Sequence, residues 1–142
     1  MTRVRGEGPK SAKIVVVAEA PGEREIALGR PLIGPSGFKL ESWWHTVGLH
    51  RGQLRLENVV EIRPPNNNIE ALGKTELAKW AEDLRQRLRE LADPWVIVPL
   101  GNTALWALTG HEGITKWRGS LLEWHDGERK IKVIPSLHPA GV

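Results

Sequence analysis

The chain contains no cysteine among its 142 residues. This absence excludes disulfide bonds, catalysis by a thiol, and zinc or iron–sulfur centres held by cysteine. No apolar run is long enough to cross a membrane and no signal-peptide pattern opens the chain, so we expect a soluble protein of the cytoplasm. Low-complexity tracts and linker-like segments are absent as well, which favours one folded unit.

The aromatic residues are nearly all of one kind, with seven Trp, one Phe and no Tyr. Trp80, Trp95 and Trp106 fall in patterns that indicate helix or core packing. With 40% hydrophobic residues, the chain is long enough for one core and short for two. We therefore expect residues 1–142 to form a single domain.

The charge balance is only slightly basic, with 20 Lys and Arg against 17 Asp and Glu. The resulting formal charge of +3 is compatible with a polyanionic partner such as nucleic acid, but it does not identify one.

Strand and helix patterns alternate along the chain. The predicted strands are residues 13–18, 57–62, 95–100 and 130–135, and the first and third are nearly continuous apolar runs, as in a sheet covered on both faces. The predicted helices are residues 36–47 with Ser36 as N-cap, residues 75–92, and residues 103–108 ending near Gly110. Residues 120–136 read as a hairpin that turns at Asp126 and Gly127. This order predicts an α/β three-layer sandwich, with a mostly parallel four-stranded sheet flanked by helices.

Polar residues stand in or just after the predicted strands. Glu19 follows the first strand, Asn58 lies in the second, Asn102 follows the third and His138 follows the fourth. In a parallel α/β sheet, ligands bind at the carboxyl ends of the strands. We therefore expect these side chains to converge on one crevice.

Five motifs follow one another along the chain from residue 18 onward. They are AEAPGE (residues 18–23), GRPLIGPSG (29–37), NVVEIRPPNNN (58–68), LGNTALWALTG (100–110) and LHPAGV (137–142). Each motif alone is common, but the five in this order, with intervening segments of fitting length, resemble the uracil-DNA glycosylase superfamily and especially its family 4 branch. The resemblance covers nearly the whole chain from Ile14 onward.

The resemblance implies an activity that suits these residue types. Hydrolysis of a deoxyribosyl N-glycosidic bond builds positive charge on the sugar and negative charge on the departing base, so a site needs an anion and hydrogen-bond donors. The resemblance makes Glu19 the anion that positions or deprotonates a water, and His138 the donor to the pyrimidine O2. The expected protein is a monomeric, monofunctional DNA glycosylase that flips a pyrimidine, uracil by default, and leaves an abasic site.

Further residues are assigned to base and DNA contacts. The resemblance makes Asn58 the reader of the flipped base, and Leu32, Ala20 and Gly22 are expected to line the base site. Arg30, Lys39, Lys116 and Arg118 are candidate contacts to DNA phosphates. Structural alternatives stay open: a salt-bridged carboxylate for Glu19, a strand-edge amide for Asn58, and solvated surface charges for the four basic residues.

The iron–sulfur cluster of family 4 enzymes has no ligands here. Two of the cysteine positions that the family uses fall at Ile62 and Trp80, and neither side chain can bind iron. We expect packing to replace the cluster, and we expect no metal and no cofactor.

Leu32 is a second departure, because the family has an aromatic ring at this position to stack on uracil. Stacking on an aromatic side chain is worth about 1–3 kcal/mol per base. Leucine therefore predicts weaker uracil binding or room for a bulkier base. The alternative function is a glycosylase for modified pyrimidines of viral DNA, which would act in phage defence.

The end of the sequence is a third departure. Family members continue past the HP motif with a loop that wedges into the duplex and a terminal helix, whereas this sequence stops at Val142. Flipping a base from a duplex costs a few kcal/mol, which single-stranded DNA avoids. A truncated chain and a preference for single strands are both open.

Two alternatives come from other classes of protein. One is a non-catalytic module that binds DNA or a base, since a fold does not determine a function. The other is a nucleotide-binding α/β protein, which the absence of the GxGxxG and GxxxxGK[ST] motifs makes a poor match.

Overall fold

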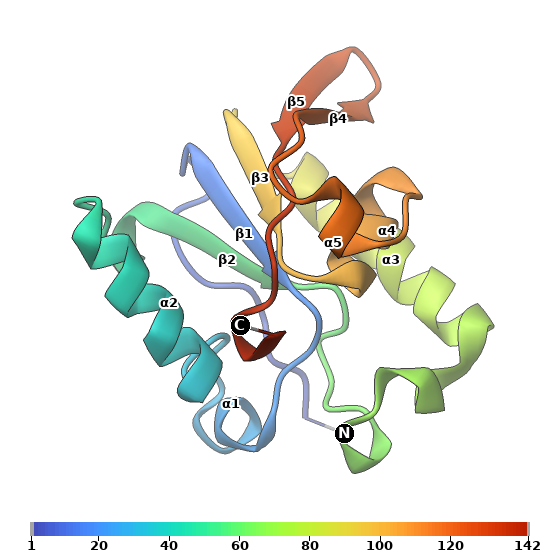
Figure 1. The fold of residues 1–142 in the computed structure, drawn as a ribbon. Helices are drawn as coiled ribbons and strands as arrows, with labels where there is room; N and C mark the ends of the chain where they lie inside the picture. Colours follow the sequence, from blue (N-terminus) through green and yellow to red (C-terminus); the bar gives the residue numbers. More distant parts are fainter. Residues whose placement is uncertain (1, 142) are drawn as a thin grey trace.

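The computed structural model describes residues 2–141, which form a five-stranded sheet in the order β2-β1-β3-β5-β4 with helices on both faces (Figure 1). Four strands are parallel: β1 (Ile14–Ala18), β2 (Leu54–Asn58), β3 (Val96–Pro99) and β5 (Arg129–Val133). The fifth, β4 (Leu122–Asp126), pairs antiparallel with β5 at the edge. The three-layer α/β prediction is confirmed, whereas the count of four strands is wrong by one. Met1 and Val142, the ends of the predicted domain, lie outside the described residues.

The extra strand is the first half of the predicted hairpin. Asp126 pairs with Arg129 across the turn, and Gly127 has the positive φ of 56° that such a tight turn requires. The strand β4 lacks the apolar run that marked β1 and β3 in the sequence, because Trp124 is its one buried residue.

The second strand begins and ends earlier than its apolar residues predict. It runs over Leu54–Asn58, and the predicted residues 59–62 form bends beyond its end. Val59 and Val60 are nevertheless buried, and their amides donate to the carbonyls of Ala18 and Glu19 at 2.9 Å each. These valines therefore belong to the core without belonging to the strand.

Three main helices pack on the sheet: α2 (Pro35–Thr46), α3 (Gly73–Arg89) and α4 (Asn102–Thr109). Helix α2 begins at Gly34 as N-cap with Pro35 in the first turn, so the prediction of Ser36 as N-cap is wrong. Gly110 caps α4 in the left-handed conformation, as predicted.

Shorter helices were not predicted. They are α1 (Glu23–Leu28), α5 (Ile114–Trp117) and four 3₁₀ turns: η1 (Arg51–Gln53), η2 (Pro65–Asn67), η3 (Ile69–Leu72) and η4 (Pro139–Gly141). Among residues 2–141, no helix has the length and apolar character needed to cross a membrane.

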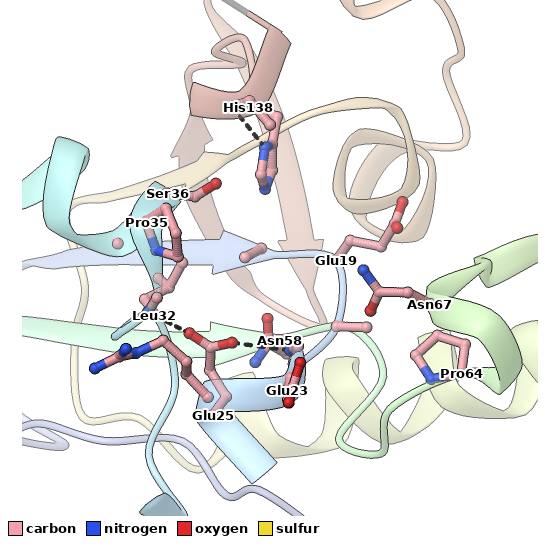
Figure 2. A pocket seen from close by; sticks show the side chains of 17 residues that line it. Glu19, Glu23, Glu25, Leu32, Pro35, Ser36, Asn58, Pro64, Asn67 and His138 are labelled. Carbon is pink, nitrogen blue, oxygen red and sulfur yellow. Dashed lines mark hydrogen bonds between the residues drawn. The ribbon is translucent and has the colours of Figure 1, made fainter. Parts of the chain in front are cut away.

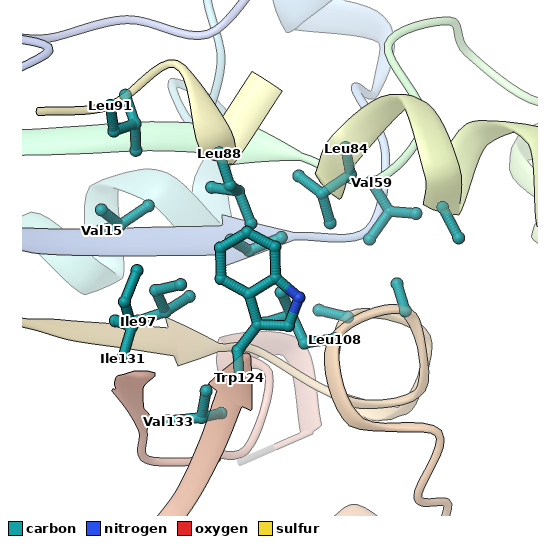
Figure 3. Close-up of a cluster of buried hydrophobic side chains, with 14 of the residues drawn as sticks. Val15, Val59, Leu84, Leu88, Leu91, Ile97, Leu108, Trp124, Ile131 and Val133 are labelled. Atoms are coloured by element: carbon teal, nitrogen blue, oxygen red, sulfur yellow. The ribbon is translucent and has the colours of Figure 1, made fainter. Parts of the chain in front are cut away.

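The sheet separates two apolar clusters. Val15 and Val17 of β1 face α3 and α4, where Trp124 packs among aliphatic side chains (Figure 3), whereas Val16 and Ala18 face α2. Trp80 and Trp106 pack against the first cluster, as predicted. Trp95 is 67% exposed, so its predicted core role is wrong.

Candidate active site

One pocket of about 510 Å³ opens at the carboxyl ends of β1 and β2 (Figure 2). It brings together the six residues that the sequence assigned to catalysis and base binding. They are Glu19, Ala20, Gly22, Leu32, Asn58 and His138. These residues come from four separate parts of the chain, and the parallel sheet aligns the ends of the strands that carry them.

Glu19 stands directly after β1 on a well-fixed backbone. Its carbonyl accepts a hydrogen bond from the Val60 amide at 2.9 Å. Its carboxylate is partly buried, and Oε2 accepts a hydrogen bond from Thr103 Oγ1 at 2.6 Å. Within residues 2–141 this is the one hydrogen bond to the carboxylate, so Oε1 is available to a ligand or a water.

His138 reaches the pocket from the segment that follows β5. Its Nδ1 accepts a hydrogen bond from the Ala140 amide at 3.1 Å, so the neutral ring carries its proton on Nε2 (Figure 2). Burial lowers the pKa of His138, and the negative charge of Glu19 opposes that shift. The ring is therefore a neutral Nε2–H donor at physiological pH.

Asn58 ends β2 with a side chain that is 3% exposed. It lines the pocket, and within residues 2–141 its carboxamide makes no hydrogen bond. Its polar atoms border the pocket space, so both can pair with a ligand. Arg87 of α3 fixes the backbone here by donating to the Asn58 carbonyl at 3.0 Å and the Val59 carbonyl at 2.9 Å.

Leu32 forms part of the wall in a backbone conformation that leucine seldom adopts, with φ at +52°. Arg51 holds this conformation by donating to the carbonyls of Pro31 and Leu32, the latter at 2.6 Å. Gly37 is needed beside it, because a Cβ there would lie 1.9 Å from the Leu32 carbonyl oxygen.

Glu25 organises the glycine-rich turns and was missed by the sequence analysis. Its carboxylate accepts hydrogen bonds from the amides of Gly22 at 2.9 Å, Ile33 at 3.0 Å and Gly34 at 2.5 Å. The available signal was the spacing of Gly22 and Glu25, which is that of an N-cap and the third residue of a helix. Pro64, Asn67 and Thr103, which also line or contact the site, had no comparable signal.

The four candidate phosphate contacts lie outside the pocket. Arg30 makes a two-point ion pair with Glu7, at 2.7 and 2.9 Å. Lys39 donates to the Pro139 carbonyl at 3.3 Å, which places it beside the His138 segment. Lys116 lies over the ring of Trp117 at 5.4 Å, and Arg118 lines a separate hollow. Their role in DNA binding stays a prediction.

The residues at the cluster positions do not fit an iron–sulfur centre. Ile62 and Trp80 pack against the core. Arg3 lies 5.0 Å from the Trp80 ring centroid and pairs with Glu61 at 2.6 Å and Asp83 at 3.0 Å. Residues 2–141 contain no group of three His, Asp or Glu side chains placed to hold a metal. Apolar packing and ion pairs therefore occupy this region.

The pocket combines groups that suit the cleavage of a bond between a sugar and a base. Glu19 offers a negative charge with one free oxygen, whereas His138 offers a neutral donor. The Asn58 carboxamide can both donate and accept. A carboxylate and separate donors in one partly buried site can stabilise opposite charges that develop on the two sides of a breaking bond.

The family model described as the Uracil DNA glycosylase superfamily matches residues 5–142. The chain is 40% identical over 139 residues to the type-4 uracil-DNA glycosylase of Thermotoga maritima. The matched region covers 96% of this chain and 69% of that protein. It is 36% identical to the proteins of the same name from Sulfurisphaera tokodaii and Archaeoglobus fulgidus, covering 96% and 98% of this chain and 64% and 71% of theirs. The chain thus spans about two thirds of the length of these relatives. It belongs to the uracil-DNA glycosylase superfamily, on the family 4 branch.

Proposed function

We propose that this protein is a monofunctional DNA glycosylase that hydrolyses the N-glycosidic bond of uracil in DNA and leaves an abasic site. The observation that carries the proposal is the meeting of Glu19, His138 and the unpaired amide of Asn58 in one pocket. The three relatives named above are type-4 uracil-DNA glycosylases, and their names support the same reaction.

Glu19 acts on the sugar side of the bond. As the bond between C1′ and N1 lengthens, its electron pair moves to the base and the sugar becomes cationic. The free Oε1 of Glu19 holds a water molecule and accepts a proton from it as the water oxygen bonds to C1′. Until that bond forms, the negative charge of the carboxylate stabilises the sugar cation. Proton transfer of this kind contributes about 10²–10⁴-fold to the rate.

His138 acts on the base side. The negative charge of the departing uracil collects partly on O2, where the Nε2–H of the neutral ring can donate a hydrogen bond. The hydrogen bond from Ala140 to Nδ1 fixes this tautomer and the orientation of the ring. A preorganised donor needs no rearrangement during the reaction, so its stabilisation is felt mainly in the transition state.

Asn58 reads the base. The uracil edge presents an N3–H donor and an O4 acceptor, and a carboxamide offers the complementary acceptor and donor. Asn58 lines the pocket and is only 3% exposed, so a base must leave the stack to reach its side chain. Base flipping is therefore part of the proposal.

Base release from short oligonucleotides tests this proposal. Single- and double-stranded oligonucleotides that carry one uracil, or thymine or cytosine at the same place, would be incubated with the protein, and freed bases identified by mass spectrometry. We expect uracil alone to be released, and we expect Asn58→Ala to reduce its release. Release of cytosine as readily as uracil would contradict the role of Asn58, because cytosine presents an N3 acceptor and an N4 amino donor in place of the N3–H and O4 of uracil.

Leu32 favours a second candidate function. Its side chain lines the pocket where the family resemblance places an aromatic ring, so a bulkier modified pyrimidine is the alternative substrate. A stacking ring is worth about 1–3 kcal/mol, so Leu32→Phe should strengthen uracil binding if uracil is the natural base. If DNA rich in modified pyrimidines loses only those bases, and Leu32→Phe abolishes their release, the specialised glycosylase and a role in phage defence are favoured.

The non-catalytic module is the remaining alternative. It predicts that the wild-type protein binds DNA and releases no base from any of these substrates. The carboxylate and the histidine in one pocket favour catalysis over this reading, because binding alone has no need of a water-activating group.

A further inference from the structure

Thr103 contacts the proposed water-activating carboxylate from a distant part of the chain. Its hydroxyl donates to Glu19 Oε2 at 2.6 Å across 84 residues of sequence. We infer that Thr103 is a positioning residue, which holds one carboxylate oxygen of Glu19 so that the other faces the substrate water. This inference rests on the proposed glycosylase function and assigns a role in that reaction to a residue of α4.

The position of Thr103 is fixed by the start of α4. Gly101, the N-cap, donates its amide to the Ser136 carbonyl at 3.0 Å, which ties the helix start to the segment after β5. Asn102 Oδ1 accepts from the Ile114 amide at 2.6 Å, which ties it to α5. Because the first turn of α4 also contains the buried residues Ala104 and Leu105, it is a rigid support for the hydroxyl.

Glu19 needs such a support. Its backbone is held by the Val60 amide, but its side chain has several rotatable bonds and projects into an open pocket. A hydrogen bond from a hydroxyl to a carboxylate at 2.5–2.7 Å is charge-assisted and about twice as strong as a neutral one. The contact with Thr103 therefore limits the carboxylate to one orientation.

The direction of the Thr103 hydroxyl differs from that of the other threonine in the same helix. Thr109 donates to the carbonyl of Leu105, four residues earlier, at 2.8 Å, which is a common arrangement for threonine within a helix. Thr103 stands in the first turn, where it donates out of the helix to Glu19. Thr109 thus provides a matched control in the same element.

The test compares Thr103→Val, Thr103→Ser and Thr109→Val. Valine removes the hydroxyl at nearly constant shape, and serine keeps it. We expect Thr103→Val to lower kcat for uracil release by about 10- to 100-fold with little change in KM, because small misplacements of a catalytic group cost up to about 10²-fold. Thr103→Ser should restore most of kcat, and Thr109→Val should keep the wild-type kcat.

Two results would overturn the inference: wild-type kcat in Thr103→Val, or an equal loss of kcat in Thr103→Val and Thr109→Val. Crystal structures of the wild type and Thr103→Val give a readout that needs no activity. The inference predicts that the Glu19 carboxylate rotates in the variant, and an unmoved carboxylate would contradict it. A wild-type protein that releases no base would instead contradict the proposed function, and the two failures are thereby distinguished.

Discussion

At the scale of single residues, the charge of Glu19 and the protonation of His138 are linked. The two side chains line the same pocket, and each would stabilise charge on one side of the breaking bond. Burial lowers the pKa of His138 and the carboxylate of Glu19 raises it; burial has the larger effect, so the ring is neutral. A neutral ring retains the hydrogen bond that Nδ1 accepts from Ala140.

This link gives a prediction for Glu19→Gln. Removing the negative charge removes the one influence that raises the pKa of His138, so the variant's His138 should titrate at lower pH than in the wild type. The measurement is an NMR titration of the His138 Cε1–H signal. Glu23→Gln is the control, because Glu23 lines the same pocket, whereas the influences on the His138 pKa are burial and Glu19. An unchanged or raised His138 pKa in Glu19→Gln would contradict the predicted geometry.

Individual residues also show how far a sequence can predict a site. Glu19 and His138 were predictable because each follows a strand, and parallel strands bring such ends together. Asn58 was assigned from the family resemblance, because the predicted strand 57–62 placed it near the opposite end from the one that it occupies in β2. Thr103 and Arg87 were not, because their roles depend on contacts across 84 and about 29 residues that no local pattern records. Leu32 was predicted at the base site, but its positive φ depends on Arg51 and was not foreseen.

At the scale of elements, α3 supports the end of β2 through buried charge. Glu57 is 0% exposed, and its carboxylate pairs with Arg87 at 2.7 Å and Arg55 at 2.8 Å. Arg87 also holds the carbonyls of Asn58 and Val59. The boundary of β2 was mispredicted for the same reason: a buried glutamate and the valines that follow it obscure where the strand ends.

We predict that Arg87→Met destabilises the fold and impairs base recognition. Methionine leaves Glu57 with Arg55 as its remaining partner and removes the hydrogen bonds to the carbonyls of Asn58 and Val59. Breaking a buried ion pair costs up to about 3–5 kcal/mol. Urea unfolding measures this loss. Arg89→Met is the matched control on the same helix, because its ion pairs with Glu82 and Asp126 are more exposed and are screened by solvent. Equal losses in the two variants would contradict the role assigned to Arg87.

At the scale of the whole molecule, the N-terminal segment closes the outer edge of the sheet. Glu7 exchanges backbone hydrogen bonds with Leu56 of β2, at 2.9 and 2.8 Å. Its side chain pairs with Arg30 and Arg51, and Arg51 in turn holds the Leu32 loop. One carboxylate thus joins the sheet edge to the wall of the pocket, and no local sequence pattern connects these segments.

The acid stability of the protein should depend on Glu7. Hydrogen bonds from Arg30 and then Arg51 lower the pKa of Glu7 from 4.5 to about 2, so its contribution to folding is complete above pH 4.5 and is lost as the pH falls toward 2. Glu7→Gln should therefore lower the melting temperature at pH 7, and the difference from wild type should narrow below pH 4.5. Glu112→Gln, at an exposed position, is the control. A difference that stays constant between pH 7 and pH 3 would contradict this account.

The measurement that tests the central claim most directly is uracil release by Glu19→Gln, with DNA binding measured on the same samples. Free uracil would be quantified by mass spectrometry after incubation with a single-stranded uracil oligonucleotide, with Glu23→Gln as the matched control. The account predicts that the wild type and Glu23→Gln release uracil. Glu19→Gln should still bind the DNA but release uracil about 10²–10⁴-fold more slowly. Release at the wild-type rate by Glu19→Gln, or no release by the wild type, would contradict the claim that this pocket is a glycosylase active site.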